Sequence, residues 1–357
     1  MIEIRPGTEA DRPQILARME EVFGAEPARR AEHLWDWQWQ QDPRLPSPGY
    51  RGVVADWDGR LIGVLSTIPA GLHIGGEPVQ AWWFVDVLVH WGLSRQALRA
   101  HRRAAAQGSA DLSQGIAAAL FNHPAAGPIQ LGKHIADAMM TIAHRLGFAY
   151  LPDTGSLQRR VSVRYPLGRL LGTRLGDLTG AVADLALPSI PRPPLPVRLH
   201  EGPFDDRFDS LWESVRPRYP AICRRDSALL DWRYRRHPDQ DYRILIVESG
   251  QSIRGYCVTK VFERGGRRRG KIVDLLAAPG DTEAQRGLLA GALWDLRRQG
   301  AERAECFYTG ARQREVLTSL EFKARLSKSR RPQPLMLRGL PGSVPELYVT
   351  QGDGDGG

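Results

Sequence analysis

The sequence is poor in cysteine and has no long apolar run. Its 357 residues include three cysteines, Cys223, Cys257 and Cys306, which are scattered and odd in number. Such a set forms neither a disulfide framework nor a zinc site, so we expect reduced thiols, no metal and a cytoplasmic protein. No apolar run approaches the roughly 20 residues of a membrane span. The start, MIEIRPGTEADRP, lacks an apolar core, so we expect no signal peptide.

The charge balance is basic, with a formal net charge of +9. The hydrophobic fraction of 42% and the charged fraction of 25% are typical of a globular protein. A basic surface suits phosphorylated cofactors, acidic carrier proteins or nucleic acid. The same balance is common in arginine-rich proteins of GC-rich genomes that bind no polyanion, so both interpretations stay open.

One short motif occurs twice. LWDWQWQQDP (34–43) and LLDWRYRRHP (229–238) share an aspartate, two aromatic residues and a proline at matched positions. Trp37 and Trp232 are 195 residues apart, and the same offset relates IEIRPGTEADR (2–12) to VRLHEGPFDDR (197–207). A repeat at one spacing predicts two copies of one domain.

Each copy also shows the same order of expected elements. A strand and a helix precede the tryptophan motif, and a β-meander follows it, with turns at Asp58–Gly59 and Ser249–Gly250. Asp86 and Asp274 then lie inside apolar runs that predict strands. A helix, a strand and a final helix complete each copy, and the first copy's late strand is expected at 116–124. The pattern predicts a mixed α/β fold in two tandem domains.

The stretch LALPSIPRPPLPV divides the copies. Proline at this density prevents regular structure, so 185–197 is expected to be a linker. We therefore expect an N-terminal domain at 1–184 and a C-terminal domain at 198–350. The glycine-rich end at 351–357 is expected to be disordered.

These features resemble the GCN5-related N-acetyltransferase (GNAT) superfamily in tandem form. The paired tryptophan motifs and the ending LYVTQGDGD are more closely similar to two-domain acyltransferase-like proteins encoded near bacterial polysaccharide genes. The resemblance implies that acyl-CoA, such as acetyl-CoA, inserts between the fourth and fifth strands. Its pyrophosphate would then rest on the start of the following helix.

The donor-binding residues implied by the resemblance fall in the first copy. The family's loop pattern is Arg/Gln-x-x-Gly-x-Gly/Ala, but here Leu98 replaces the first glycine after Arg95. In the second copy acidic residues stand where phosphate would lie, so we expect a degenerate site there. The expected donor-binding residues are Leu88, Val89, Gly92, Ser94, Arg95, Gln96, Arg99 and Asn122.

Two residues are candidates for catalysis. His123 is expected at the end of the fifth strand, and its ordinary pKa near 6.5 suits a general base at neutral pH. Asp86 would orient or polarise, or would itself be the base. The alternatives are an exposed loop histidine and a structural aspartate, and the occurrence of Asp274 in the degenerate copy favours the latter.

The tryptophan motifs and an arginine-rich turn complete the candidates. The motif residues are expected at strand or turn spacing, where they either pack on the sheet or form an acceptor wall. The residues of that wall would be Trp37, Trp39, Trp232, Arg233 and Tyr234. RGGRRRG (264–270) is expected at a hairpin tip, as a solvated turn or a contact for nucleic acid or an acidic carrier protein.

Three functions remain open from the sequence. The first is acyl transfer from acyl-CoA or an acyl carrier protein to an amine of a small metabolite or amino sugar, in polysaccharide biosynthesis. The second is an aminoacyl-tRNA-dependent transferase of the peptidoglycan-bridge type, with tRNA as a less favoured partner. The third is a non-catalytic binding protein of the same fold. A monomer and a homodimer are both compatible with the sequence.

Overall fold

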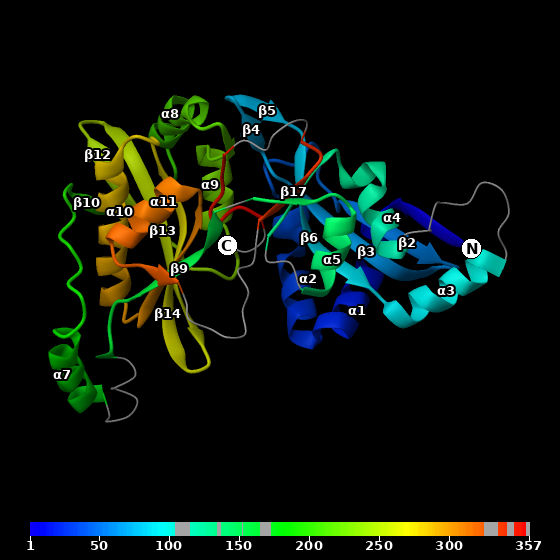
Figure 1. The fold of residues 1–357 in the computed structure, drawn as a ribbon, viewed down its shortest axis with the longest axis horizontal. Helices are drawn as coiled ribbons and strands as arrows, with labels where there is room; N and C mark the ends of the chain where they lie inside the picture. Colours follow the sequence, from blue (N-terminus) through cyan, green and yellow to red (C-terminus); the bar gives the residue numbers. More distant parts are fainter. Residues whose placement is uncertain are drawn as a thin grey trace. The chain divides into compact units, whose positions relative to one another are not determined.

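The chain forms two units, each with its own sheet (Figure 1). The computed structural model describes residues 1–103, 115–133, 137–151, 153–164, 173–324, 335–340 and 346–354. Unit 1 comprises Met1–Leu72, Val79–Leu151 and Leu335–Ser343, and unit 2 comprises His73–Pro78, Pro152–Pro334 and Val344–Gly357. These bounds differ from the predicted domains, because segments of each copy lie in the unit of the other.

Unit 1 is built on a sheet of strand order β1-β2-β3-β6-β7-β17-β8 in the described residues. Its strands are β1 (Ile2–Pro6), β2 (Gly52–Trp57), β3 (Arg60–Pro69), β6 (Ala81–Val89), β7 (Ile129–Gly132), β17 (Met336–Arg338) and β8 (Ala149–Tyr150). Its helices are η1 (Glu9–Asp11), α1 (Arg12–Phe23), α2 (Ala25–Trp39), α3 (Trp91–Arg103), α4 (Ile116–Asn122), η2 (Pro124–Ala126) and α5 (Asp137–Arg145).

The turn predicted at Asp58–Gly59 in unit 1 is confirmed. Asp58 and Gly59 both have positive φ, 50° and 83°, as the tight turn between β2 and β3 requires. Thr8 and Asp11 form a capping box at the start of the first helical segment.

The strand predicted at 116–124 is wrong. Residues Ile116–Asn122 form helix α4, and the strand that follows is β7, at Ile129–Gly132. A short apolar run does not distinguish a buried helix from a buried strand. Three consecutive alanines favour the helix, and α4 packs in the core of unit 1.

Unit 2 repeats the same sheet, with the order β10-β12-β13-β14-β15-β9-β16. Its strands are β10 (Val197–His200), β12 (Arg243–Ser249), β13 (Ser252–Arg264), β14 (Arg267–Ala277), β15 (Arg303–Thr309), β9 (Thr154–Arg160) and β16 (Lys323–Ala324). A smaller sheet joins β18 (Leu347–Tyr348), β11 (Ala221–Cys223), β4 (Leu72–Ile74) and β5 (Glu77–Val79). The helices are α7 (Thr173–Asp184), α8 (Asp206–Val215), η3 (Arg216–Arg218), α9 (Ser227–Tyr234), α10 (Thr282–Arg298) and α11 (Ala311–Ser319).

Alternating side chains of the unit 2 sheet fill two cores. Helices α10 and α11 cover one face of the sheet (Figure 1). Leu245 and Val247 of β12 pack in the core with residues of these two helices. Ile244 and Ile246 pack with α8 and α9 on the other face. The period of two along β12 therefore buries both faces of the sheet.

The two sheets confirm the repeat and reveal an exchange of strands. β17 follows the second copy's last strand in the chain but pairs with β7 and β8 of unit 1. β9 follows the first copy's last strand but pairs with β15 and β16 of unit 2. Each unit thus completes its sheet with one strand from the other copy.

Candidate functional site

Strand β6 of unit 1 parts from β7 halfway along its length. The two strands pair in parallel from Ala81 opposite Ile129 to Trp83 opposite Leu131. A register shift between β6 and β3 lies beside Asp86, where Leu65 faces Val87 and Thr67 faces Phe84. Beyond this bulge the backbone of β6, including Leu88 and Val89, continues without β7 alongside it. Such a splay offers unpaired backbone groups to an extended ligand.

Helix α3 begins directly after the splayed strand. The Nδ1 atom of His90 accepts a hydrogen bond of 3.1 Å from the N–H of Leu93 and so caps the helix start. Gly92 is exposed. Ser94 is buried and donates its hydroxyl hydrogen to the Ile62 carbonyl at 3.3 Å. The N-terminus of α3 is therefore capped by the His90 side chain and fixed to β3 through Ser94.

The basic residues of α3 lie toward solvent. Arg95, Gln96 and Arg99 are exposed. Leu98, which replaces the family's glycine, packs against the core of unit 1. The leucine that departs from the family's loop pattern therefore packs α3 against the core. The side chains of Arg102 and Arg103 lie outside the described part of the chain.

Asp86 lies near a buried tyrosine on the splayed strand. It is half-buried, and its negative charge adds to the effect of burial in raising the pKa of Tyr50. The Tyr50 hydroxyl is 2.9 Å from the Ser66 hydroxyl. The Tyr50 ring stacks on Trp35 at a centroid distance of 5.3 Å. This arrangement holds a neutral phenol close to the carboxylate.

His123 does not lie on a strand. It ends α4, and its Nδ1 accepts a 3.1 Å hydrogen bond from the Ala125 N–H. Asn122 is exposed and accepts a 2.7 Å hydrogen bond from Arg338 of β17. The hydrogen bonds of this turn are local or directed to β17, while Asp86 lies near Tyr50. The sequence predicted that a strand ends at His123 and places this residue beside Asp86. His123 instead follows helix α4, so this reason for pairing the two residues is lost.

The tryptophan motifs lie in helices, so their predicted strand or turn spacing is wrong. Trp37 is half-buried and Trp39 is buried in α2. Trp232, Arg233 and Tyr234 are buried in α9. Residues i and i+4 lie on one helix face, so Trp35 and Trp39 both reach Tyr50. This burial favours the packing interpretation over an acceptor wall.

Asp274, the repeat equivalent of Asp86, lies in a buried network. Its carboxylate accepts hydrogen bonds at 2.9–3.1 Å from five donors. The donors are Arg225 Nε, the Tyr234 and Tyr256 hydroxyls, the Thr350 hydroxyl and the Leu275 N–H. Burial and the carboxylate raise the pKa values of Tyr234 and Tyr256. A carboxylate with five donors is structural.

Sequence reasoning missed Arg225, the cation of this network. Burial acts to lower its pKa, but the carboxylates of Asp274 and Asp353 outweigh burial, and the pKa lies well above its ordinary value. Its guanidinium contacts Asp353 at 2.6 Å. Asp274 and Asp353 lie 49 and 128 residues from Arg225 in the chain, so no local sequence pattern predicts these ion pairs.

The predicted disorder of the C-terminal end is wrong for its described residues, Gln351–Gly354, which are buried in unit 2. The Gly352 N–H donates to the Val273 carbonyl of β14 at 2.8 Å. The Val349 N–H donates to the Thr309 hydroxyl of β15 at 3.0 Å. Arg233 donates to the carbonyls of Gly352 and Gly354. Residues 355–357 lie outside the described part.

The C-terminal segment lies in the splay of unit 2. β14 and β15 pair only from Arg269 opposite Arg303 to Ile272 opposite Cys306. Val273, the next residue of β14, binds Gly352 as described. A cavity of about 210 Å³ remains at the outer end of this splay, lined by Leu275, Thr309, Arg312 and Tyr348 among others. The chain itself thus occupies the inner part of the second splay.

All three cysteines lie in unit 2. Within the described ranges, no group of three or more His, Cys, Asp or Glu side chains is placed to hold a metal ion. The three cysteines are buried and form no disulfide, and burial raises the pKa of Cys306 to about 12. No described helix has the length and apolar character to cross a membrane.

Comparison with known proteins identifies this topology. Residues 3–108 match the family model of a GNAT acetyltransferase domain. The chain has the fold of two tandem GNAT-like domains. No curated protein matches it in sequence.

Three solved structures illustrate the GNAT likeness. A GCN5-related N-acetyltransferase from Anabaena variabilis is 12% identical, with a TM-score of 0.59 over 95% of this chain and 72% of that one. One from Kribbella flavida is 15% identical, with a TM-score of 0.53 over 95% and 71%. N-myristoyltransferase from Saccharomyces cerevisiae, with bound myristoyl-CoA, is 13% identical, with a TM-score of 0.54 over 94% and 78%. At these identities the likeness concerns the fold.

Proposed function

We propose that this GNAT-fold protein is an N-acyltransferase that takes the acyl group of an acyl-CoA in unit 1 and transfers it to an amine of a small molecule. The observation that carries the proposal is the open splay of β6 from β7 at the bulge beside Asp86. The corresponding splay of unit 2 contains the chain's own C-terminal segment. Among the described residues, no segment of the chain pairs with the inner backbone of the first splay, which supports placing the donor there.

The start of α3 supports the same placement. It offers backbone N–H groups and the exposed cations Arg95 and Arg99 to a phosphate group. The start of α10 in unit 2 is different. Asp281 caps it by accepting from the Ala284 N–H and also pairs with Arg254 at 2.7 Å. A carboxylate at that position repels phosphate.

The chemistry assigned to unit 1 is a single acyl transfer. The amine nitrogen attacks the thioester carbonyl, the carbon–sulfur bond breaks, and the CoA thiolate leaves and is protonated. A base must remove one proton from the nitrogen. Of the two candidates we favour Asp86, which lies at the bulge, over His123, which ends a helix. An amino sugar destined for a polysaccharide is the acceptor that we propose.

Calorimetry with acyl-CoAs of increasing chain length tests the donor site. Arg95→Glu should weaken binding by about tenfold or more, because it turns a cation beside the phosphate into an anion. Arg286→Glu changes an exposed arginine in α10 of unit 2 and serves as the matched control. Equal affinity of wild type and Arg95→Glu, or a loss confined to Arg286→Glu, would exclude unit 1 as the donor site.

A further inference from the structure

Three arginines stand side by side on neighbouring strands of the unit 2 sheet. Arg269 of β14 is in register with Arg303 of β15, and Arg303 is in register with Arg160 of β9. Neighbouring strands lie about 4.8 Å apart, and residues in register point to the same face. Arg267, two residues before Arg269, extends the row on that face. We call these four residues the arginine row.

The row has no internal charge compensation. Like charges directly opposite each other destabilise a sheet. Burial lowers the pKa of Arg303, and the positive charges of Arg160, Arg269 and Arg267 lower it further. The next rank of the same sheet, in contrast, places Glu305 beside Lys271. The sheet therefore places a carboxylate beside a cation one rank away, whereas three arginines adjoin each other in the row itself.

The hydrogen bonds of the row leave donors unused. In the part of the chain that the structure describes, no carboxylate forms an ion pair with Arg160, Arg269 or Arg303. Arg303 donates to the Gln158 side-chain oxygen at 3.2 Å. The Nε atom of Arg269 is buried and lacks a hydrogen-bond partner among the described residues. An unpaired buried donor is costly unless a ligand accepts from it.

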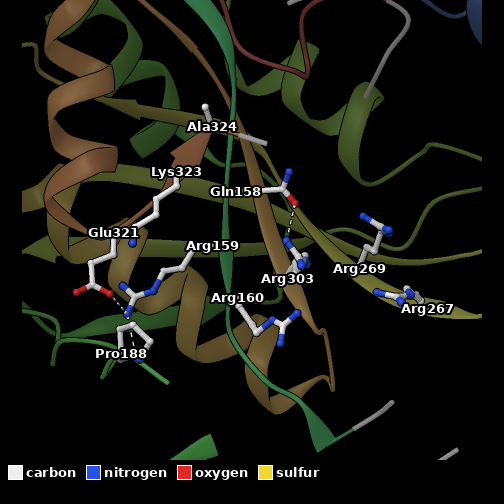
Figure 2. Close-up of a pocket in the computed structure, with 10 residues that line it drawn as sticks. All are labelled: Gln158, Arg159, Arg160, Pro188, Arg267, Arg269, Arg303, Glu321, Lys323 and Ala324. Carbon is white, nitrogen blue, oxygen red and sulfur yellow. Dashed lines mark hydrogen bonds and ion pairs between the residues drawn. The ribbon is translucent and has the colours of Figure 1, made fainter. Parts of the chain in front are cut away.

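Two acids lie near the row. Glu302 contacts Arg267, at the end of the row, at 3.8 Å, and Glu321, which also lines the pocket, contacts Arg159 at 3.8 Å. Figure 2 shows Arg159 extending to the opposite side of β9 from the row, toward Pro188 and Glu321. The row thus faces an open pocket of about 540 Å³, a size typical of small-molecule sites.

We propose that the arginine row binds a small molecule carrying a diphosphate group. Guanidinium groups bind phosphate oxygens with paired hydrogen bonds, and one diphosphate can contact three cations in a row. Among the described residues that line the pocket, none has an aromatic side chain on which a nucleic-acid base could stack. A compact anion therefore fits the pocket better than a single-stranded nucleic acid. The arginine row lies at the end of β14 that pairs with β15, and the splay of unit 2 lies at the other end of β14.

Calorimetry on the full chain with inorganic pyrophosphate tests this proposal at constant ionic strength. We expect the arginine row to bind pyrophosphate about tenfold or more tightly than orthophosphate, because orthophosphate reaches fewer cations. Arg160→Gln and Arg303→Gln should each weaken pyrophosphate binding by at least about tenfold. Arg160 is exposed, so its variant is expected to fold even where Arg303→Gln does not.

Two controls separate the row from general charge. Arg268→Gln removes the same charge between two row residues, but a strand alternates its faces, so this variant should bind like wild type. Arg95→Glu removes the phosphate contact proposed for α3 of unit 1, so pyrophosphate that still binds to this variant, and is lost when Arg160→Gln is added, is bound at the arginine row. Equal losses in Arg268→Gln and Arg160→Gln would overturn the proposal.

Melting temperatures give a second readout. Pyrophosphate should raise the melting temperature of wild type but not of Arg160→Gln. Without anions, Arg160→Gln should melt at or above the wild-type temperature, because repulsion within the row is relieved. Absence of pyrophosphate binding to wild type would refute the site. A single-stranded oligonucleotide could also bind more tightly than pyrophosphate, in a manner that requires Arg160. That result would refute the small-molecule ligand in favour of nucleic acid.

Discussion

Asp86 and Asp274 occupy equivalent strand positions but have different surroundings. Asp274 is buried and accepts hydrogen bonds from five donors. Asp86 is half-buried, beside the open splay and the neutral Tyr50. The same side chain therefore holds the C-terminal segment in unit 2, and in unit 1 it lies at the bulge where we propose that the substrate binds.

We expect Asp86→Asn to lower kcat/KM by roughly two orders of magnitude, because the amide cannot accept the amine proton. Its melting temperature should change little. His123→Ala should retain most of the turnover, since His123 ends a helix and caps its own turn. Steady-state kinetics with an acyl-CoA and an amine acceptor decide the matter. A dead His123→Ala enzyme with an active Asp86→Asn enzyme would reverse the two roles.

Asp274→Asn is the matched control for Asp86→Asn. It should lower the free energy of unfolding by about 3–5 kcal/mol, because a buried carboxylate partner of Arg225 is lost. Urea unfolding of both variants separates the structural aspartate from the catalytic one. If Asp86→Asn were the more unstable protein, the assignment of Asp86 to catalysis would lose its support.

At the scale of elements, the C-terminal segment acts as part of the unit 2 sheet region. Tyr348 donates from its hydroxyl to the Leu275 carbonyl, and Gly352 donates to the Val273 carbonyl. The segment thereby satisfies backbone groups of β14 that β15 does not reach. Unpaired groups of this kind would otherwise be costly in a buried sheet.

Gly352→Ala should destabilise unit 2 by about 1–3 kcal/mol, since the added methyl group would lie 2.1 Å from the Tyr234 hydroxyl. Gly280→Ala is the control, because a methyl group there meets no atom within 4 Å. Thermal unfolding monitored by circular dichroism measures both variants. Equal melting temperatures of the two variants would show that the segment does not pack as described.

At the scale of the whole molecule, the two units are linked by exchanged strands. Leu337 of β17 is buried in unit 1, although it follows the second copy in the sequence. Leu157 of β9 is buried in the core of unit 2, although it follows the first copy. Damage to one copy's sequence should therefore weaken the sheet of the other copy.

Hydrogen exchange on two alanine variants tests this exchange. Leu337→Ala should lower amide protection in β6 and β7 while leaving β14 protected, and Leu157→Ala should do the reverse. Each change should cost about 2–4 kcal/mol, because it leaves a cavity beside the sheet. Loss of protection confined to the unit on the same side of 185–197 as the substitution would contradict the exchange.

The sequence by itself determined the features that are local or periodic. The turn at Asp58–Gly59, the strands around Asp86 and Asp274, and the repeat at one offset follow from side-chain alternation and turn chemistry. The repeat also indicated the fold, because equal order in two copies is hard to obtain by chance.

Only the tertiary structure decided which segments pair at long range. The tryptophan motifs and residues 116–122 became helices, because burial on a helix face outweighed a short pattern that fits either structure. Arg225 pairs with Asp353, which is 128 residues away in the chain. This pair helps to bury a glycine-rich end that composition alone predicts to be disordered. The arginine row formed because β9 crosses to β15, which places Arg160 beside Arg303. Such contacts depend on the closed fold, since no residue's neighbours in the chain specify them.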